Sequence, residues 1–286
     1  MYPRLVWTAP DGTTFDFNDG VNCILTTRRS GFGFPAMDHR RVDPPARHGA
    51  VYTGTRAGDR LIRFTVAMNA DSWAALGALN RQANDALNPL GDGTGQLGTL
   101  LFQHDQDAPI FVADCIIMAP TGNKLRIVGY EEADVAFWAP SPFWRQVPIN
   151  QRTINVSGSG LSVPLSMPLH MPSLIGSSVI TNAGQFPAAP TITLTGTLEN
   201  PVVRNATTGR QVRFNYTLTP GDYLVIDVEN AKVTLNGERG MRYLAPGSQL
   251  TRLVLVRGQN TIQVAADDGE GQAEIEYYDL YLGVDW

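Results

Sequence analysis

The chain has 286 residues, of which 43% are hydrophobic and 17% charged, and its formal net charge is −5. This length and composition support one large core or two smaller ones, which excludes a disordered protein. The acidic balance excludes general nucleic-acid binding driven by neutralisation of phosphates. The start of the sequence has no signal-peptide pattern, and no run approaches the roughly 18 apolar residues of a membrane span. We therefore expect a soluble protein that is made inside a cell and does not enter a membrane.

The N-terminal part of the chain predicts short strands and one long loop. Residues 4–17 contain two strand candidates around a Pro-Asp-Gly turn, and residues 21–27 and 60–68 are further candidates. Residues 26–50 are rich in Gly, Pro and Arg and have no apolar period. We therefore expect a long loop there, and long loops inside compact domains usually carry a function or contact a partner.

One helix is predicted, over residues 71–87. Its apolar residues recur at steps of three and four along one stripe, which favours packing of that stripe on a sheet. Asp71 or Ser72 is placed to cap its start, and Pro89 follows its end. Further strands are expected over residues 110–118 and 124–130.

Four large aromatic rings and two prolines are concentrated in residues 133–144. Val135 and Phe137 alternate with smaller or polar residues, which predicts a strand, and the prolines then end that strand because they lack an N–H. A flexible tether would leave these rings in water, so we expect a rigid hydrophobic elbow between two domains. The alternative is the last strand of an ordinary core. The candidate junction residues are Phe137, Trp138, Pro140, Pro142, Phe143 and Trp144.

The sequence after the elbow predicts an all-β domain. Residues 146–181 are sparse in charge, and apolar residues alternate over 161–171, so we expect an extended segment at a sheet edge rather than a free linker. From Asn182 onward, strand patterns alternate with turn signals at the spacing of a β-sandwich. We therefore expect two domains, over residues 1–145 and 146–286.

Nothing in the sequence assembles a catalytic or metal site. The four histidines are scattered, and none has the spacing of metal ligands. Cys23 and Cys115 are expected to be buried thiols, with a disulfide or a reactive pair as alternatives. Tyr277, Tyr278 and Tyr281 are candidates for a sugar-stacking platform or for packing inside a sandwich. We therefore predict no catalytic residue, no cofactor and no metal ion.

Several segments past residue 130 resemble one protein family in their order. They are the aromatic-proline junction FWAPSPFW, then NAGQFPAAPTITLTGTLENPVVRNATTG, LTPGDYLVIDVENAKVTLNG and VRGQNTI. In combination they resemble the distal tail proteins (Dit) of long-tailed, non-contractile phages and related gene transfer agents. The resemblance is good over residues 130–265 and looser over residues 1–130, where the helix and strands fit without a sharp motif.

The resemblance implies a mainly β protein, with an N-terminal tail-tube-like β domain that has one helix, followed by a galectin-like β-sandwich. It implies a structural role as a homohexameric ring that connects the tail tube protein to the tail-associated hub protein of the baseplate. The tape measure protein and DNA would pass through its channel without specific binding. The protein would lie at the tail tip of the virion after assembly in the host cytoplasm. A carbohydrate-binding, receptor-binding protein that uses the C-terminal sandwich is the alternative, and an enzyme is third.

Arginines are concentrated in and beside the predicted loop, where eight fall within 36 residues against three aspartates. Three interpretations are open: docking onto an acidic surface of a neighbouring subunit or ring, lining of a DNA channel, or a solvated loop without a role. Docking is favoured over channel lining because strong phosphate contacts would hold DNA that must slide past. The eight are Arg28, Arg29, Arg40, Arg41, Arg47, Arg56, Arg60 and Arg63, and the candidate interface residues are the first five.

Overall fold

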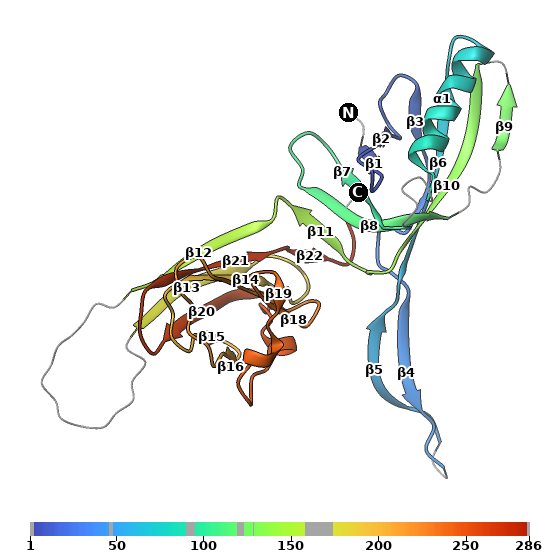
Figure 1. The fold of residues 1–286 in the computed structure, drawn as a ribbon. Coiled ribbons are helices and arrows are strands. Elements are labelled where there is room, and N and C mark those ends of the chain that lie inside the picture. The colour runs from blue at the N-terminus through green and yellow to red at the C-terminus, as the bar shows by residue number, and fades with distance from the viewer. Residues whose placement is uncertain are drawn as a thin grey trace, which may run out of the picture. The chain divides into compact units, whose positions relative to one another are not determined.

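The computed structural model describes residues 3–45, 48–89, 95–118, 123–127, 129–157 and 174–284. The chain divides into two compact units (Figure 1). Unit 1 comprises Met1–Val147 and Tyr281–Trp286, and unit 2 comprises Pro148–Leu280. Both units consist mainly of antiparallel strands, and one α-helix is present among the described residues. The prediction of a mainly β fold with one helix is confirmed.

Unit 1 contains one large sheet and a separate hairpin. The sheet has the strand order β2-β1-β7-β8-β10-β6-β3, with β9 beside β10 and β11 beside β8. The hairpin consists of β4 and β5. The elements are β1 (Arg4–Thr8), β2 (Thr14–Asp16), β3 (Cys23–Ser30), β4 (Met37–Val42), β5 (Val51–Ala57), β6 (Arg60–Asn69), α1 (Trp73–Ala86), β7 (Gly98–Gln103), β8 (Ile110–Met118), β9 (Asn123–Ile127), β10 (Tyr130–Ala139) and β11 (Trp144–Val147), and the last strand of the chain is β22 (Leu280–Tyr281).

The core of unit 1 lies between this sheet and α1. Strands β6 and β10 pair along their whole length, from Tyr130 opposite Asn69 to Ala139 opposite Arg60. Alternate residues of β6 point into the core, where Phe64 packs against Phe137. Ser72 caps α1, since its hydroxyl accepts a hydrogen bond from the Ala75 N–H at 3.2 Å. The buried helix residues are Leu76, Ala83 and Ala86.

The predicted long loop of residues 26–50 instead contains the end of one strand and the whole of another. Residues up to Ser30 complete β3, and residues 37–42 pair with residues 51–57 as the hairpin β4–β5. Figure 1 shows this hairpin continuing from β3 and β6, away from α1. At its base Gly31 has a φ of +85°, and an added Cβ would lie 2.1 Å from the Leu61 carbonyl oxygen, so the bend requires glycine. The prediction was wrong because a two-stranded hairpin has both faces in water and therefore shows no apolar period.

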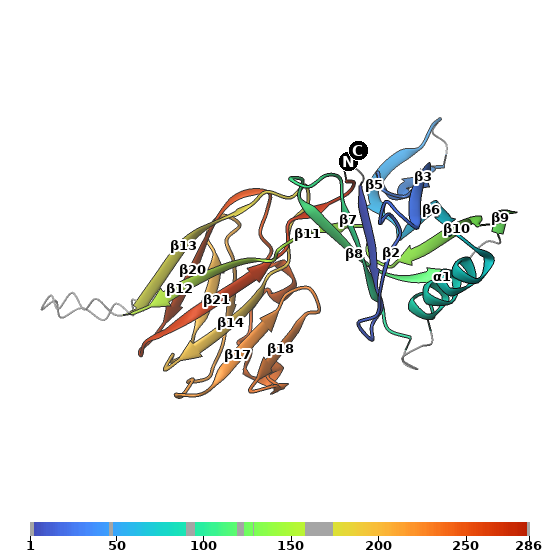
Figure 2. The same ribbon diagram turned by 90° about the horizontal axis from the view of Figure 1, so that it is seen from above.

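Unit 2 is a sandwich of two sheets. The six-stranded sheet has the order β12-β21-β14-β17-β18-β19, and the four-stranded sheet has the order β13-β20-β15-β16 (Figure 2). Buried residues of both sheets, such as Ile192 and Val264, belong to one core. The elements are β12 (Asn150–Val156), β13 (Leu174–Asn182), β14 (Thr191–Gly196), β15 (Val202–Asn205), β16 (Arg210–Arg213), β17 (Tyr223–Asp227), β18 (Lys232–Leu235), β19 (Glu238–Arg239), the 3₁₀ turns Met241–Tyr243 and Leu250–Arg252, β20 (Gly258–Ala266) and β21 (Gly271–Tyr277).

The boundaries of the two units differ from the predicted division into residues 1–145 and 146–286. Strands β12 and β13 occupy the two ends of the predicted edge segment 146–181, and the alternating residues 161–171 lie outside the described part of the chain. The last residues of the chain return to unit 1, where Val284 is buried and its N–H donates to the Phe32 carbonyl at 2.9 Å. No helix in the described residues has the length and apolar character that a membrane crossing requires.

Candidate assembly surfaces

The hairpin β4–β5, residues 37–57, is exposed over most of its described residues, and we call it the arginine arm. Arg40 and Arg41 on β4 and Arg56 on β5 are exposed, and Arg40 Nε forms an ion pair with Asp38 Oδ2 at 3.9 Å. Exposed ion pairs of this length contribute little to the stability of the fold. The predicted interface residue Arg47 lies outside the described residues.

The arginine arm also exposes three apolar side chains that the sequence analysis missed. Val42 lies opposite Val51, and Tyr52 lies opposite Arg41. Their exposed fractions are 55% for Val42, 43% for Val51 and 64% for Tyr52. A two-stranded hairpin is marginally stable alone in water, so exposed apolar side chains on it make it a candidate contact surface. The signal in the sequence was two valines and a tyrosine flanking the turn of a stretch otherwise rich in charge.

Two other predicted interface residues, Arg28 and Arg29, lie on β3 beside Arg63 of β6. Together with Asp134 they line a groove of about 310 Å³. Partial burial lowers the pKa of Arg29. Thr65 in the same groove donates from its hydroxyl to Asp134 Oδ1 at 2.5 Å. The groove therefore extends the basic surface of the arm onto the sheet.

Arg60 differs from the other arginines because it is only 1% exposed. Its guanidinium donates to the carbonyl groups of Pro142 (3.1 Å from Nε and 2.6 Å from Nη2), Gly33 (2.7 Å), Leu282 (2.6 Å) and Gly31. Burial lowers the pKa of Arg60 to about 10, which leaves it charged at neutral pH. Arg60 is therefore a structural residue that joins three segments of unit 1, and it is not one of the five candidate interface residues.

The predicted junction residues lie within unit 1. Phe137 and Trp144 have no exposed surface and belong to its core, where Phe137 contacts Trp7 and Trp144 contacts Phe32. These two residues therefore follow the alternative in which the segment belongs to an ordinary core. They lie within unit 1 because the chain passes to unit 2 only after Val147. Trp138 is 38% exposed, and its Nε1–H donates to Asp59 Oδ2. Of the remaining junction residues, Pro140 is exposed, and Pro142 and Phe143 are half-buried.

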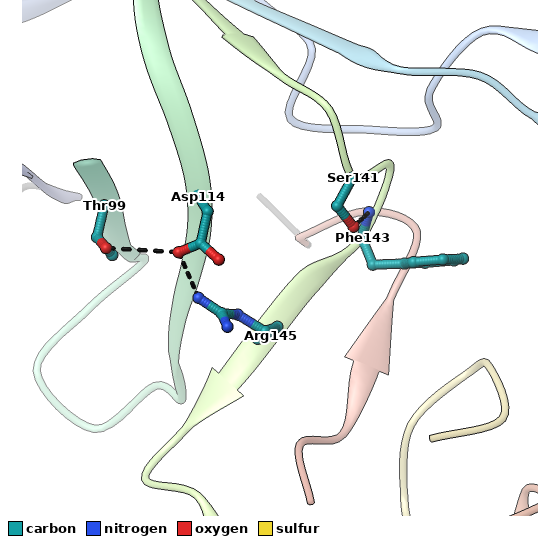
Figure 3. A network of polar contacts seen from close by, with 5 residues as sticks. All are labelled: Thr99, Asp114, Ser141, Phe143 and Arg145. Carbon is teal, nitrogen blue, oxygen red and sulfur yellow. Dashed lines mark hydrogen bonds and ion pairs between the residues drawn. The ribbon is translucent and has the colours of Figure 1, made fainter. Parts of the chain in front are cut away.

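A polar network holds the chain segment after the prolines in place (Figure 3). Arg145 on β11 forms an ion pair through Nη2 with Asp114 Oδ1 on β8, and the Thr99 hydroxyl on β7 donates to the same oxygen at 3.5 Å. The Phe143 N–H donates to the Ser141 hydroxyl at 3.3 Å. The strand register allows this ion pair, since Arg145 lies opposite Val112 of β8, two residues from Asp114. These contacts fix β11 on the sheet of unit 1.

The described residues form no group of His, Cys, Asp or Glu that could hold a metal ion. Cys23 and Cys115 are free and buried, as predicted. The proposed sugar platform is not present as an exposed surface, because Tyr277 is 5% exposed and its hydroxyl donates to the Thr181 carbonyl at 2.8 Å. The Tyr281 hydroxyl donates to Gln146 Oε1 at 2.9 Å. Tyr277 therefore follows the sandwich-packing alternative, whereas Tyr281 packs on the core of unit 1.

Comparisons with known proteins agree with this architecture. Residues 183–281 match the family model "Siphovirus-type tail component, C-terminal domain". No curated protein sequence matches the chain. The crystal structure of the SPP1 Dit protein, titled "a Paradigm of Hub Adsorption Apparatus in Gram-positive Infecting Phages", is 14% identical, with a TM-score of 0.67 and coverage of 97% of this chain and 99% of that chain.

Two structures of the phage P2 baseplate in its activated conformation are also similar. The structure with Ca is 13% identical, with a TM-score of 0.52, and the structure with Sr is 12% identical, with a TM-score of 0.53. In both, 96% of this chain and 98% of the other chain are covered. The chain therefore has a fold similar to that of a distal tail protein, and residues 183–281 match the C-terminal domain of the siphovirus-type tail components, which confirms the resemblance to the Dit family.

Proposed function

We propose that this chain is a structural component of a phage tail tip that forms a hexameric ring between the tail tube and the baseplate hub. The observation that carries the proposal is the combination of a tail-component match in unit 2 with a fold similar to SPP1 Dit over 97% of the chain. The protein acts by assembly and not by catalysis. Its place is the virion, after assembly in the host cytoplasm.

The ring has four partners in this proposal. The tail tube protein binds one side, and the tail-associated hub protein binds the other. The tape measure protein and then DNA pass through the central channel without specific binding. The basic residues Arg28, Arg29, Arg40 and Arg41 serve docking between proteins, because arginine pairs with carboxylates in two-point geometry. Their exposure, together with the exposed valines of the arm, supports this role.

Electron microscopy of the purified protein tests the ring directly. We expect particles with six-fold symmetry and a central hole, and light scattering at micromolar concentration is expected to give six times the chain mass of 31.1 kDa. If the protein is monomeric alone, the same measurement is made with the tail tube protein added. A stable dimer with two-fold symmetry, or a monomer that stays monomeric with the tube protein present, would contradict the proposal.

A further inference from the structure

Strands β3 and β6 connect two opposite ends of unit 1. Toward one end they lead into the arginine arm through Ser30 and Arg60. At the other end the Asn69 N–H donates to the Asn22 carbonyl at 2.7 Å, and the Ala70 N–H donates to the Gly129 carbonyl at 2.8 Å. These bonds bring together residues 16–24, 69–73 and 129–132, which we call the acidic end.

The two ends carry opposite charge. The arm contains four arginines and two aspartates, and Arg28, Arg29 and Arg63 line the groove on β3 and β6. The acidic end contains five carboxylates and no lysine or arginine, although the neighbouring strand β9 carries Lys124 and Arg126. Of the five, Glu131 is buried and accepts from Asn80 Nδ2 at 2.8 Å, whereas Asp19 and Asp71 are exposed and Asp16 and Glu132 are half-exposed.

Both ends also expose large apolar side chains. At the acidic end the exposed fractions are 73% for Val21, 46% for Trp73 and 37% for Ile24. Val21 and Ile24 lie in or beside the turn that follows Asp19, and Trp73 begins α1. The arm presents Val42, Val51 and Tyr52 in the same way. Apolar surfaces of this kind supply contact area, and opposite charges around them supply direction and partner choice.

From this complementarity we propose that the arginine arm of one copy docks onto the acidic end of unit 1 of a second copy. The two surfaces are different, so the contact is heterologous, and each copy offers one arm and one acidic end. A heterologous contact repeated around a rotation axis closes into a ring. The inference rests on the proposed ring, and it names the contact that joins neighbouring subunits.

Two charge reversals test the contact. The arm variant is R40E/R41E, and the acidic-end variant is D71K/E132K. Asp19 is kept, because its carboxylate accepts from the backbone N–H groups of Val21, Asn22 and Cys23, each at 2.8 Å, and its loss would disturb the fold. The matched control is R204E/R257E, which reverses two exposed arginines of unit 2.

Each reversed protein alone brings like charges together, so we expect its self-association to weaken on the order of 100-fold or more relative to the parent. An equimolar mixture of the two variants places acidic arms against basic ends and basic arms against acidic ends. Association in the mixture should return to within about tenfold of the parent, in complexes that alternate the two chains. The control should associate like the parent. Light scattering measures the association, and native mass spectrometry measures the alternation.

Neutral variants keep the test independent of folding. R40Q/R41Q and D71N/E132Q should each weaken association, but mixing them should restore nothing, because no new attraction arises. Circular dichroism checks that every variant is folded. If the parent forms rings that neither reversal weakens, or if mixing the folded reversed variants restores nothing, this contact is wrong while the ring stands. If the parent stays monomeric with the tail tube protein present, the ring itself is wrong and the contact fails with it.

Discussion

Arg60 is buried although it belongs to the most basic stretch of the chain. Its guanidinium exchanges water for four backbone carbonyl groups and lies 5.6 Å from the centre of the Trp144 ring. The sequence contained a signal for this position. Along β6, alternate residues from Ile62 to Met68 point into the core, and Arg60 continues the same alternation by one step. The count of charges groups Arg60 with the exposed arginines, whereas the strand period places its side chain in the core, where the structure has it.

Replacing Arg60 with methionine is expected to destabilise unit 1 by about 3 kcal/mol or more, because several buried carbonyl groups lose their donor while the side-chain volume is nearly kept. All five tryptophans of the chain belong to unit 1, so tryptophan fluorescence during urea unfolding reports on that unit. Arg63→Met at an exposed position of the same strand is the control and should change the free energy of unfolding by no more than about 0.5 kcal/mol. Equal stability of the two variants would contradict the structural role of Arg60.

Trp144→Ala is expected to cost about 3–5 kcal/mol, because a fully buried ring in contact with Phe32 and Phe102 is replaced by a cavity. Trp138→Ala is the matched control, since that ring is 38% exposed and lies on the same connection. We expect a much smaller loss there. Urea unfolding followed by circular dichroism compares the two. A loss at Trp138 as large as that at Trp144 would show that the exposed ring is also structural.

The two free thiols make the stability of unit 1 sensitive to alkaline pH. Burial raises the pKa of Cys23 from its ordinary 9.0 to about 12, and burial also raises the pKa of Cys115. Between these values the unfolded chain releases the thiol proton and the folded chain keeps it. The stabilisation is therefore complete below pH 9 and is lost as the pH rises toward 12.

We expect the unfolding midpoint to fall between about pH 9 and pH 11, and to fall less in a Cys23→Ala variant, which lacks one of the two titrations. In the native protein near pH 8, an aromatic disulfide reagent should label neither thiol within minutes, and it should label both after denaturation. Rapid labelling of the native protein would contradict the burial.

Among the elements, the arginine arm is the part of unit 1 whose removal the fold tolerates best. The Gly58 N–H donates to the Ala36 carbonyl at 2.8 Å, so a two-residue Asn-Gly turn can join these residues in place of residues 37–57. None of the described residues of the arm belongs to the core of unit 1. We expect the shortened protein to keep the parent's free energy of unfolding within about 0.5 kcal/mol but to lose self-association. Unchanged association by light scattering would show that the arm has no part in assembly.

The elements show how far the sequence could predict this fold. Strand β8 was predicted with its observed bounds, and α1 lies inside the predicted 71–87, because period 2 and period 3.6 are strong where one face is buried. The arm was missed because it has no buried face. The elbow residues were recognised as a hydrophobic group, but their burial within unit 1 depended on pairing across the sheet, which no local pattern records.

At the scale of the whole molecule, unit 2 should fold alone. Every residue of its buried core lies between Ile154 and Tyr277, so residues 148–280 contain a complete sandwich. A fragment of these residues is expected to give a β-type circular dichroism spectrum and to stay monomeric, because the arm and the acidic end both belong to unit 1. Gel filtration with light scattering measures its mass. A fragment that is unfolded, or that forms oligomers like the full chain, would contradict this division.

The return of the chain's last residues to unit 1 sets an order of events during protein synthesis. The Leu282 carbonyl that binds Arg60 and the buried Val284 leave the ribosome only after the whole sandwich has been translated. A chain that stops within unit 2 therefore lacks both the Leu282 carbonyl and Val284. We expect unit 1 of such a chain to be less stable than unit 1 of the whole chain, although the truncation removes residues far away in the sequence.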